Sequence, residues 1–441
     1  MPSCKSCFMD EVATAQAAVQ QLAQALVRAH PHYLHPKGME SAMDLLTDYL
    51  QQEVGYTLHR LTYNNSALTG SENYVPINCF GADFVDDLTR TKRSLIAIAN
   101  SVHSQQRSSH TLVLNGHYDV DGVYDPSLWS QAQGWASGCV VKGHLYGRGA
   151  TDMLGGLSAL VVAFKLLSTI QHKRNRIILS IVCDEELGGN GSLYHCQWLQ
   201  KHKNLEAKNT TVLIAEPSDG RLCTASLGFY PFTISWAETT RHAGVSKVEN
   251  AVVNDIATMI TALEDILVAA LHRCGCALGA DTYRCSIGKL NGGKDASIPL
   301  GQCSVEGVIF LAAYYPVPDI QQHFAACVQE RMHSTIALTW HPVHFPGHQS
   351  KLTPFAQYLR TTSPAPLPLG VFSSPCDARI FANAGFPVYI YGPGDLAQAH
   401  ATNESLSLDA LQQYFQHLCS ALYDYAVLPA IQPTGKGQSY A

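Results

Sequence analysis

The sequence has little charge and no concentration of positive charge. Charged residues make up 15% of its 441 residues, and the formal net charge is −6, whereas a typical soluble domain carries about 25% charged residues. The chain contains no long run of Lys and Arg. Proteins that bind nucleic acid normally present a basic patch, so the composition argues against nucleic acid as a partner.

The sequence also lacks long apolar runs and an apolar leader. No uninterrupted apolar stretch reaches the ~18 residues of a membrane-spanning helix. The N-terminal stretch, MPSCKSCFMDEVATAQAAVQQL, has no apolar signal core before its first acidic residues. Fourteen cysteines are scattered along the chain, several inside apolar or helical runs, which is not the arrangement of a disulfide scaffold. We therefore expect a soluble, cytoplasmic protein with no membrane partner.

One cysteine pair stands at the N-terminal end. Cys4 and Cys7 have the spacing of a metal-binding pair, but no second pair follows beside them. We expect them to be ordinary free thiols.

The first half of the chain alternates between strand and helix patterns. Two segments, 10–30 and around 39–54, carry apolar residues at helical spacing. Residues 110–120, 175–189 and 210–219 are apolar runs that end in polar residues, and an apolar helix opening with two glycines occupies 155–170. This order predicts an α/β domain with a mostly parallel sheet.

The pattern changes near residue 228 and returns after residue 342. Residues 229–240 alternate like a half-exposed strand, 249–271 form a long helical pattern, and 303–315 form another strand, with a turn at 292–299. We expect an α+β domain at 225–342 inserted into a catalytic domain made of 1–224 and 343–428. The Pro/Gly-rich residues 429–441 are expected to form a flexible tail.

Five polar clusters follow the strands and turns of the predicted α/β domain. They read NGHYDV, GRGATDMLGG, CDEELGG, IAEPSD and GPGDLAQAHATNES. In parallel sheets the ligand site lies at the carboxyl ends of the strands. Two imidazoles with several carboxylates suit zinc or a similar divalent ion, and the excess of acids favours two ions that share a carboxylate. The candidate residues are His117, Asp119, Asp152, Glu185, Glu186, Glu216 and His400.

Each candidate also has a simpler interpretation. A single histidine is more often hydrogen-bonded within a fold than bound to a metal. Asp152 has a residue type that often caps a helix N-terminus, and Glu216 is compatible with an ordinary loop acid. The glycines of GGNGS at 188–192 suit a phosphate, but the segment lacks the Walker lysine and the full spacing. None of these interpretations explains why all five clusters carry such residues.

The five clusters, in this order, resemble the di-zinc metallopeptidase and deacylase family. That family includes acetylornithine deacetylase, succinyl-diaminopimelate desuccinylase, aminoacylase and carboxypeptidase G, and the resemblance runs from about residue 110 to 425. It implies a zinc-peptidase-like catalytic domain interrupted by an inserted lid and dimerisation domain. It also implies two divalent ions, zinc being favoured over cobalt or manganese, and a homodimer.

The resemblance assigns a role to each candidate residue. Asp152 is expected to bridge the two ions, with His117 and Glu216 completing one site and Glu186 and His400 the other. Glu185 is expected to be the general base, taking a proton from water and returning it to the leaving nitrogen. Asp119 is expected to orient the His117 ring by accepting its second N–H.

Two further residues are assigned by the resemblance to substrate or transition-state contacts. His242, in TTRHAG, is expected to stabilise the oxyanion in a neighbouring active site, although it also fits a solvent-facing histidine at a strand end. Arg379, in SSPCDARIF, is expected to bind a substrate carboxylate, although an ion pair with Asp377 is the alternative. Two positions depart from the family pattern: Ala296 replaces an expected Asn, and Leu154 replaces an expected Lys.

The reaction expected from these residues is hydrolysis of the amide bond of a small N-acyl amino acid or related amide. The substrate is expected to be a small molecule that carries a carboxylate. A dipeptidase or carboxypeptidase on the same scaffold is the close alternative. A catalytically inactive binding homologue is a third, against which the intact Glu185 and the complete ligand set argue.

Overall fold

The computed structural model describes residues 4–51, 55–77, 88–99, 110–131, 133–170, 173–239, 242–245, 251–279, 281–363 and 365–427. The chain divides into two compact units. Unit 1 comprises Met1–Thr224, Ser350–Gly370 and Cys376–Ala441, and unit 2 comprises Ala225–Gln349 and Val371–Pro375. Unit 2 is therefore inserted into unit 1, and the two units are described separately.

The secondary structure of unit 1 is a mixed α/β arrangement. Its strands are β1 (Tyr56–Tyr63), β2 (Lys92–Ala99), β3 (Thr111–His117), β4 (Cys139–Val141), β5 (His144–Tyr146), β6 (Arg176–Val182), β7 (Thr210–Ile214), β14 (Val388–Ile390) and β15 (Ser405–Ser407). Its helices are α1 (Lys5–Ala29), α2 (Pro36–Tyr49), α3 (Gly155–Ser168), α4 (Asn190–Lys203), α7 (Pro354–Thr361), α8 (Ala378–Asn383) and α9 (Leu408–Val427). Its short helical turns are η1 (Asn65–Ala67), η3 (Pro126–Leu128), η4 (Ala150–Leu154), η5 (Ala207–Asn209) and η7 (Leu396–Gln398).

The main sheet of unit 1 has the strand order β1-β2-β6-β3-β7-β14. The four strands β6, β3, β7 and β14 are parallel, whereas β2 pairs antiparallel with β6 and β1 antiparallel with β2. Every residue of β3 and of β7 is buried, as expected for parallel strands covered on both faces. The prediction of an α/β domain with a largely parallel sheet is confirmed, and the antiparallel pair at one edge was not anticipated.

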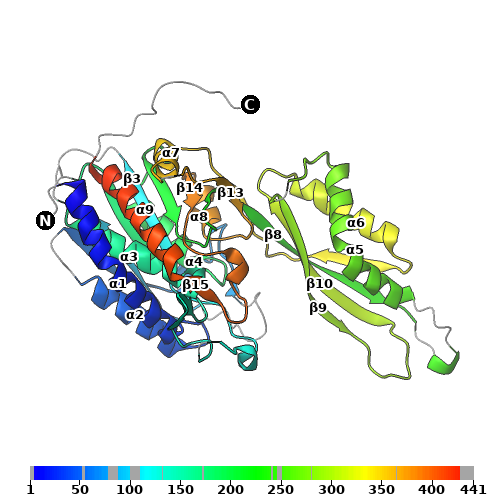
Figure 1. Ribbon diagram of the computed structural model, residues 1–441. Coiled ribbons are helices and arrows are strands. Elements are labelled where there is room, and N and C mark those ends of the chain that lie inside the picture. The colour runs from blue at the N-terminus through cyan, green and yellow to red at the C-terminus, as the bar shows by residue number, and fades with distance from the viewer. Residues whose placement is uncertain are drawn as a thin grey trace. The chain divides into compact units, whose positions relative to one another are not determined.

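Helices cover this sheet and enclose the core. Figure 1 shows α1 and α9 side by side, and both pack against α3, which lies against β3 and β6. A second group, α4 and α8, packs against β6 and β14. The last strand, β15, joins β5 and β4 in a separate three-stranded sheet. This small sheet matters for the site because β15 follows directly after the GPGDLAQAHATNES cluster.

The helical segment that begins in the second polar cluster, GRGATDMLGG, is unusually apolar. Ala150–Ser168 is long and apolar enough to cross a membrane by length and composition alone. However, 89% of the tested window is buried inside the structure, and the core helix of a globular unit passes the same test. The helix is therefore only weak evidence for a membrane segment.

Unit 2 is an antiparallel sheet covered by two helices. Its strands are β8 (Leu222–Ala237, which begins in unit 1), β9 (Tyr283–Gly292), β10 (Gln302–Ala312), β11 (Ile336–Trp340) and β12 (His348–Gln349), and β13 (Leu369–Phe372) runs from unit 1 into unit 2. Its helices are α5 (Ala251–Arg273) and α6 (Val317–Arg331), with the short turn η6 (Ala243–Val245). Along β10 buried and half-buried side chains alternate, which is the pattern of a sheet with one face against a core. Figure 1 shows α5 and α6 next to each other in this unit.

The boundary of unit 2 differs from the expected end at residue 342. Strand β12 pairs with β8, His348 being opposite Ser226, and Phe345 forms an isolated bridge with Phe229. These pairings tie residues 343–349 to unit 2 although the sequence assigns them to the catalytic domain. The expected tail at 429–441 lies outside the described residues.

Asp255 of α5 is a buried acid that links three segments of unit 2 by hydrogen bonds. Its carboxylate accepts hydrogen bonds from Trp236 Nε1 at 3.2 Å, from the His333 backbone N–H at 2.7 Å and from the Ser334 backbone N–H at 2.9 Å. Burial alone would raise the pKa of Asp255, but the hydrogen bonds from His333 and Ser334 hold it below its ordinary value. The carboxylate therefore connects α5 with β8 and with the turn after α6.

We expect Asp255→Asn to lower the free energy of unfolding at pH 7 by about 1.5–3 kcal/mol, the usual contribution of hydrogen bonds to a charged group. A lowered pKa in the folded state contributes stability above the unfolded pKa, near 3.9, and this contribution disappears as the pH falls through the folded value. The difference between the two proteins should therefore shrink below about pH 4. Denaturant unfolding and hydrogen exchange of the α5 amides measure this difference in the free energy of unfolding. The exposed Asp265→Asn on the same helix is the control, and a pH-independent difference would contradict the assigned role.

Candidate metal centre

The carboxyl ends of three parallel strands bring the polar clusters to one edge of the sheet. In the register of the sheet, His117 at the end of β3 is level with Val182 of β6, and Asn115 is level with Ile214 of β7. The acids that follow Val182 and Ile214 therefore emerge next to His117. This placement follows from parallel pairing, as the sequence pattern predicts.

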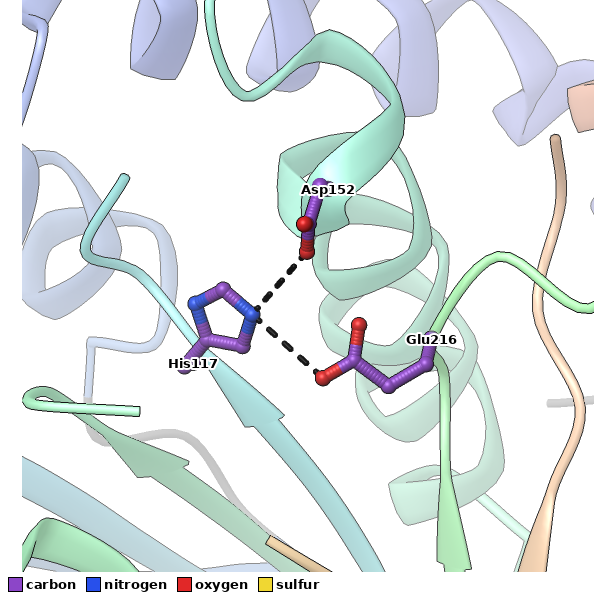
Figure 2. Close-up of side chains that lie close together, drawn as sticks. All are labelled: His117, Asp152 and Glu216. Atoms are coloured by element: carbon purple, nitrogen blue, oxygen red, sulfur yellow. Dashed lines mark ion pairs between the residues drawn. The ribbon is translucent and has the colours of Figure 1, made fainter. Parts of the chain in front are cut away.

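The first group consists of His117, Asp152 and Glu216, all of them buried. His117 Nε2 lies 3.4 Å from Asp152 Oδ1 and 3.4 Å from Glu216 Oε1. Figure 2 shows the two carboxylates converging on the same ring nitrogen, Asp152 from the helical turn η4 and Glu216 from the segment after β7. Three ligand atoms thus face a common point.

The second group consists of Asp121, Glu186 and His400. His400 Nε2 lies 3.0 Å from Glu186 Oε2 and 3.3 Å from Asp152 Oδ2, and His400 Nδ1 lies 3.4 Å from Asp121 Oδ2. Asp121 was not among the residues expected from the sequence. The signal for it was present, because Asp121 continues the alternate positions of His117 and Asp119, and alternate residues of extended backbone share a face.

Asp152 connects the two groups. Its Oδ1 faces His117 and its Oδ2 faces His400. The backbone at Asp152 is extended (φ −112°, ψ 98°) although it interrupts a helical turn. The helix that follows, α3, begins without a side-chain cap, so Asp152 does not serve as the N-cap that its residue type also suggested.

A buried glutamate fixes the segment that carries Asp152. Glu404, which is fully buried, accepts hydrogen bonds from the backbone N–H groups of Gly149, Thr151 and Asp152 at 2.9–3.1 Å. Arg148 Nη1 donates to the same carboxylate at 2.9 Å. Sequence reasoning did not single out Glu404, because a glutamate four residues after a histidine has no distinctive spacing.

The electrostatics of the site depend on the proximity of these acids and histidines. Burial alone would lower the pKa of His117, but Glu216, Asp119 and Asp152 raise it well above its ordinary value. Glu186 raises the pKa of His400 strongly. Burial raises the pKa of Glu216 to about 8. The protein alone thus leaves buried acids that resist ionisation, a cost that divalent cations would offset.

The donor set fits divalent metal ions. His117 Nε2, Glu186 Oε1 and Asp121 Oδ2 are buried and have no hydrogen-bond partner among the described residues. In each group the ligand atoms lie within 4.8 Å of one another. Imidazole and carboxylate ligands suit zinc, and a carboxylate shared between two groups suits a two-metal site.

The acid pair is held by Asp119. Asp119 Oδ1 accepts the Glu185 backbone N–H at 3.4 Å, and its Oδ2 accepts that of Glu186 at 3.2 Å. The expected contact with the His117 ring is different, because His117 Nδ1 lies 2.9 Å from the Asp119 backbone carbonyl and 3.6 Å from its carboxylate. The Asp119 backbone carbonyl is therefore the hydrogen-bond acceptor for the His117 ring. The Asp119 carboxylate instead orients Glu185 and Glu186 through their backbone N–H groups.

The first acid of the run CDEELGG, Asp184, is neutralised by a different partner. Asp184, which has a positive φ of 67°, forms a buried ion pair with Lys92 of β2. Lys92 Nζ also donates to Asn65 Oδ1 at 2.8 Å. Asp184 is therefore paired with a protein cation, while Glu185 and Glu186 face the metal groups.

Arg379 is buried near the acid pair. Its side chain is 4% exposed, and its Nη2 donates to the Gly188 carbonyl at 2.5 Å. A Cβ on Gly189, which has a positive φ of 76°, would lie 2.4 Å from Asp377 Oδ1. The second glycine of CDEELGG is thus required by the close packing of Asp377, and Arg379 supports the same turn through its Gly188 contact.

The remaining residues expected from the sequence lie elsewhere. His242 belongs to unit 2, where it is exposed and its Nδ1 accepts the Gly244 backbone N–H at 3.0 Å. Ala296 is an exposed residue of unit 2, and Leu154 is fully buried at the start of α3. Seven candidates therefore come together in unit 1, namely His117, Asp119, Asp152, Glu185, Glu186, Glu216 and His400.

Comparisons with known proteins identify the family of the chain. The model of Peptidase family M20/M25/M40 matches residues 113–424, well over half of the chain. An N-formyl-4-amino-5-aminomethyl-2-methylpyrimidine deformylase of Halalkalibacterium halodurans is 24% identical over 375 residues, covering 76% of this chain and 83% of the relative. A probable carboxypeptidase of Uncinocarpus reesii is 23% identical over 341 residues, covering 71% of this chain and 72% of the relative.

Solved structures share the fold. Human carnosine dipeptidase 1 is similar with a TM-score of 0.68 at 14% identity, over 97% of this chain and 100% of that one. A metallo-carboxypeptidase of the M20 family from Sulfolobus solfataricus is similar with a TM-score of 0.61 at 14% identity, over 92% of this chain and 98% of that one.

The fold and the site define a hydrolase that acts on C–N bonds and uses divalent metal. The chain belongs to Peptidase family M20/M25/M40. The resemblance drawn from the five sequence clusters is thereby confirmed at the level of the family.

We expect the protein to bind about two divalent ions per chain, since two ligand groups share one carboxylate. Asp152→Ala should retain the least metal because it removes a ligand from both groups. His400→Ala should retain about one ion, held by the group around His117. Elemental analysis after loading with zinc and dialysis measures the stoichiometry, with the exposed Asp409→Asn as control. Equal losses from His400→Ala and Asp152→Ala would show that Asp152 is not shared.

Proposed function

We propose that the protein hydrolyses the amide bond of a small N-acyl amino acid or related amide at a two-metal site. The observation that carries the proposal is the position of Asp152, whose two carboxylate oxygens face His117 and His400 separately. A carboxylate in this position is suited to bridge two cations. Family membership supports hydrolysis of a C–N bond, and the substrate and the number of ions are part of the proposal.

In this proposal the ligands divide as the two groups do. Asp152, His117 and Glu216 hold one ion, and Asp152, Glu186 and His400 hold the other, with Asp121 adjacent to His400. Zinc is the metal favoured by this donor set, and cobalt or manganese are accepted by similar ligands. When bound, such ions polarise an amide carbonyl and lower the pKa of water to near ~7.

Glu185 performs the proton transfers in this proposal. It is half-buried, it is held through its backbone N–H by Asp119, and His117 and Glu216 are among its charged neighbours. The carboxylate takes a proton from the attacking water and donates it to the leaving nitrogen. His242 stabilises the oxyanion from a second copy of the chain.

Two substrate classes remain in competition within the proposal. The relatives named as deformylase and desuccinylase support removal of an acyl group. The relative named as a probable carboxypeptidase supports cleavage of a peptide. We favour the deacylase because two relatives named as deformylase and four named as desuccinylase support it, whereas one relative named as a probable carboxypeptidase supports the peptidase.

The proposal also includes location and assembly. The cysteines in the described residues are all free of disulfides, which supports a reducing, cytoplasmic location. Within the described residues β9 is the last strand of its sheet, and Leu290 on β9 and Ile260 on α5 are 53% and 54% exposed. An unpaired strand edge beside exposed apolar side chains supports a homodimer formed through unit 2.

The test of the proposed chemistry compares Glu185→Gln with Glu186→Gln. Glu185→Gln should keep nearly all of its metal and lose at least ~10²-fold in turnover, the usual effect of removing a general base. Glu186→Gln should lose metal. Turnover is measured on a panel of N-acyl amino acids, N-formyl amines and dipeptides with zinc- or cobalt-loaded enzyme. If the two variants exchange phenotypes, the roles assigned within the acid pair are wrong.

The dimer proposal is tested by mixing inactive subunits. His242→Ala and Glu185→Gln should each be inactive alone, whereas their heterodimer contains one site with an intact Glu185 and the partner subunit's intact histidine. Full exchange should restore about a quarter of wild-type activity, since half of the dimers are mixed and each has one complete site. Mass spectrometry of differently labelled subunits confirms exchange. No recovery in exchanged protein would mean that each site is completed within one chain.

Substitution of Arg379 tests whether this residue binds a carboxylate of the substrate. If its guanidinium binds that group, Arg379→Ala should lose about ten- to a hundredfold in kcat/KM for an acid substrate and little for the matching amide. Arg379→Lys should recover only part, because an ammonium group does not reproduce the fork. The buried contact with Gly188 predicts the other outcome, an equal loss on both substrates. That result would assign Arg379 to the support of the acid-pair turn.

A further inference from the structure

Two cysteine thiols lie close together at the N-terminal end of α1. Cys4 is the N-cap residue of the helix, and Cys7 lies three residues later. Their Sγ atoms are 3.1 Å apart, whereas a disulfide bond is about 2.05 Å long. Both residues are exposed. A small rotation of the side chains is therefore enough to join the two sulfur atoms.

The first turn of α1 is anchored to α9. The Phe8 ring packs against the Tyr423 ring with centroids 4.9 Å apart, and Lys5 forms an ion pair with Asp424. The Phe8 backbone N–H also donates to the Cys4 carbonyl at 3.1 Å. The two thiols are consequently held on an ordered helical turn.

The two cysteines are not equivalent. The Cys7 backbone N–H points at Cys4 Sγ, 3.5 Å away, and the N-terminus of a helix favours negative charge. The hydrogen bonds from Cys7 lower the pKa of the Cys4 thiol. By contrast, burial raises the pKa of Cys183 and of Cys419 well above the ordinary value. Cys4 is therefore the thiol suited to act as a nucleophile.

A metal site is a weaker interpretation of the same pair. In the part of the chain that the structure describes, no third His, Cys, Asp or Glu completes a metal-binding group with Cys4 and Cys7. Two thiolates alone fall short of the four ligands of a structural zinc site.

We propose that Cys4 and Cys7 form a redox-active dithiol that exchanges with small-molecule disulfides of the glutathione type. The Cys4 thiolate attacks one sulfur atom of the small disulfide, and a mixed disulfide on Cys4 forms while one small thiolate leaves. The Cys7 thiol, deprotonated as it reacts, then attacks Cys4 Sγ and releases the second small thiol. The two cysteines lose two electrons and two protons, and the small disulfide gains them.

The experiment treats the reduced full-length protein with glutathione disulfide at pH 7 and maps the products by mass spectrometry. The expected product is a Cys4–Cys7 disulfide with a mass about 2 Da lower and no retained glutathione. Trypsin cleaves after Lys5, so the bond would link the peptides 1–5 and 6–28. Reduction by dithiothreitol should reverse it.

Single variants separate the two roles. Cys7→Ser should stop at glutathione bound to Cys4, and Cys4→Ser should react at Cys7 about tenfold more slowly, because Cys7 lacks the helix N-cap environment. The partly exposed Cys139 is the internal reference for an ordinary thiol. The proposal is overturned if wild-type protein accumulates one glutathione on each cysteine, or if both react no faster than Cys139.

Discussion

Repulsion among closely spaced carboxylates is the interaction around which unit 1 is organised. Glu185 and Glu186 follow β6 and Glu216 follows β7, and both strands pair in parallel with β3, so these acids emerge on the two sides of His117. Among the described residues, Lys92 pairs with Asp184 and Arg148 with Glu404, and the Arg379 guanidinium interacts with Asp377 and Glu185. The acids at the centre face two histidines, and desolvation of so many carboxylates is unfavourable without further positive charge. The demand for divalent ions is therefore a property of the fold itself.

Backbone amides give this charged centre its shape. Glu404 accepts hydrogen bonds from three backbone N–H groups of the turn that carries Asp152. Asp119 accepts hydrogen bonds from the two backbone N–H groups of the acid pair. In both cases a buried carboxylate accepts hydrogen bonds from the backbone. That backbone positions a second carboxylate, Asp152 or Glu186, in its ligand group. Such supports restrict the ligands to one geometry before a cation arrives, as outer hydrogen bonds do at metal sites generally.

The sequence was sufficient for the features that repeat along strands. Apolar runs ending in polar clusters predicted the parallel sheet, the edge where His117 and Glu216 meet, and the family. It was insufficient where partners are distant in the chain. Asp121, Glu404 and Lys92 obtain their roles from contacts across 92 to 279 residues, which no local spacing encodes. The burial of Arg379 likewise depends on packing against Gly188, and the boundary near residue 349 depends on strand pairing.

The order in which the ligands occur along the chain has a consequence for synthesis. His117, Asp152 and Glu216 precede unit 2, whereas His400 and the Glu404 clamp follow it. At about 5–20 residues per second, a ribosome needs on the order of ten to forty seconds to pass from Glu216 to His400. During that interval the nascent chain holds an acidic half-site with neither its second histidine nor the clamp on its bridging aspartate. The ligand group around His400 is therefore completed late, when the last strand and helix dock, and the nascent chain carries only the group around His117 until then.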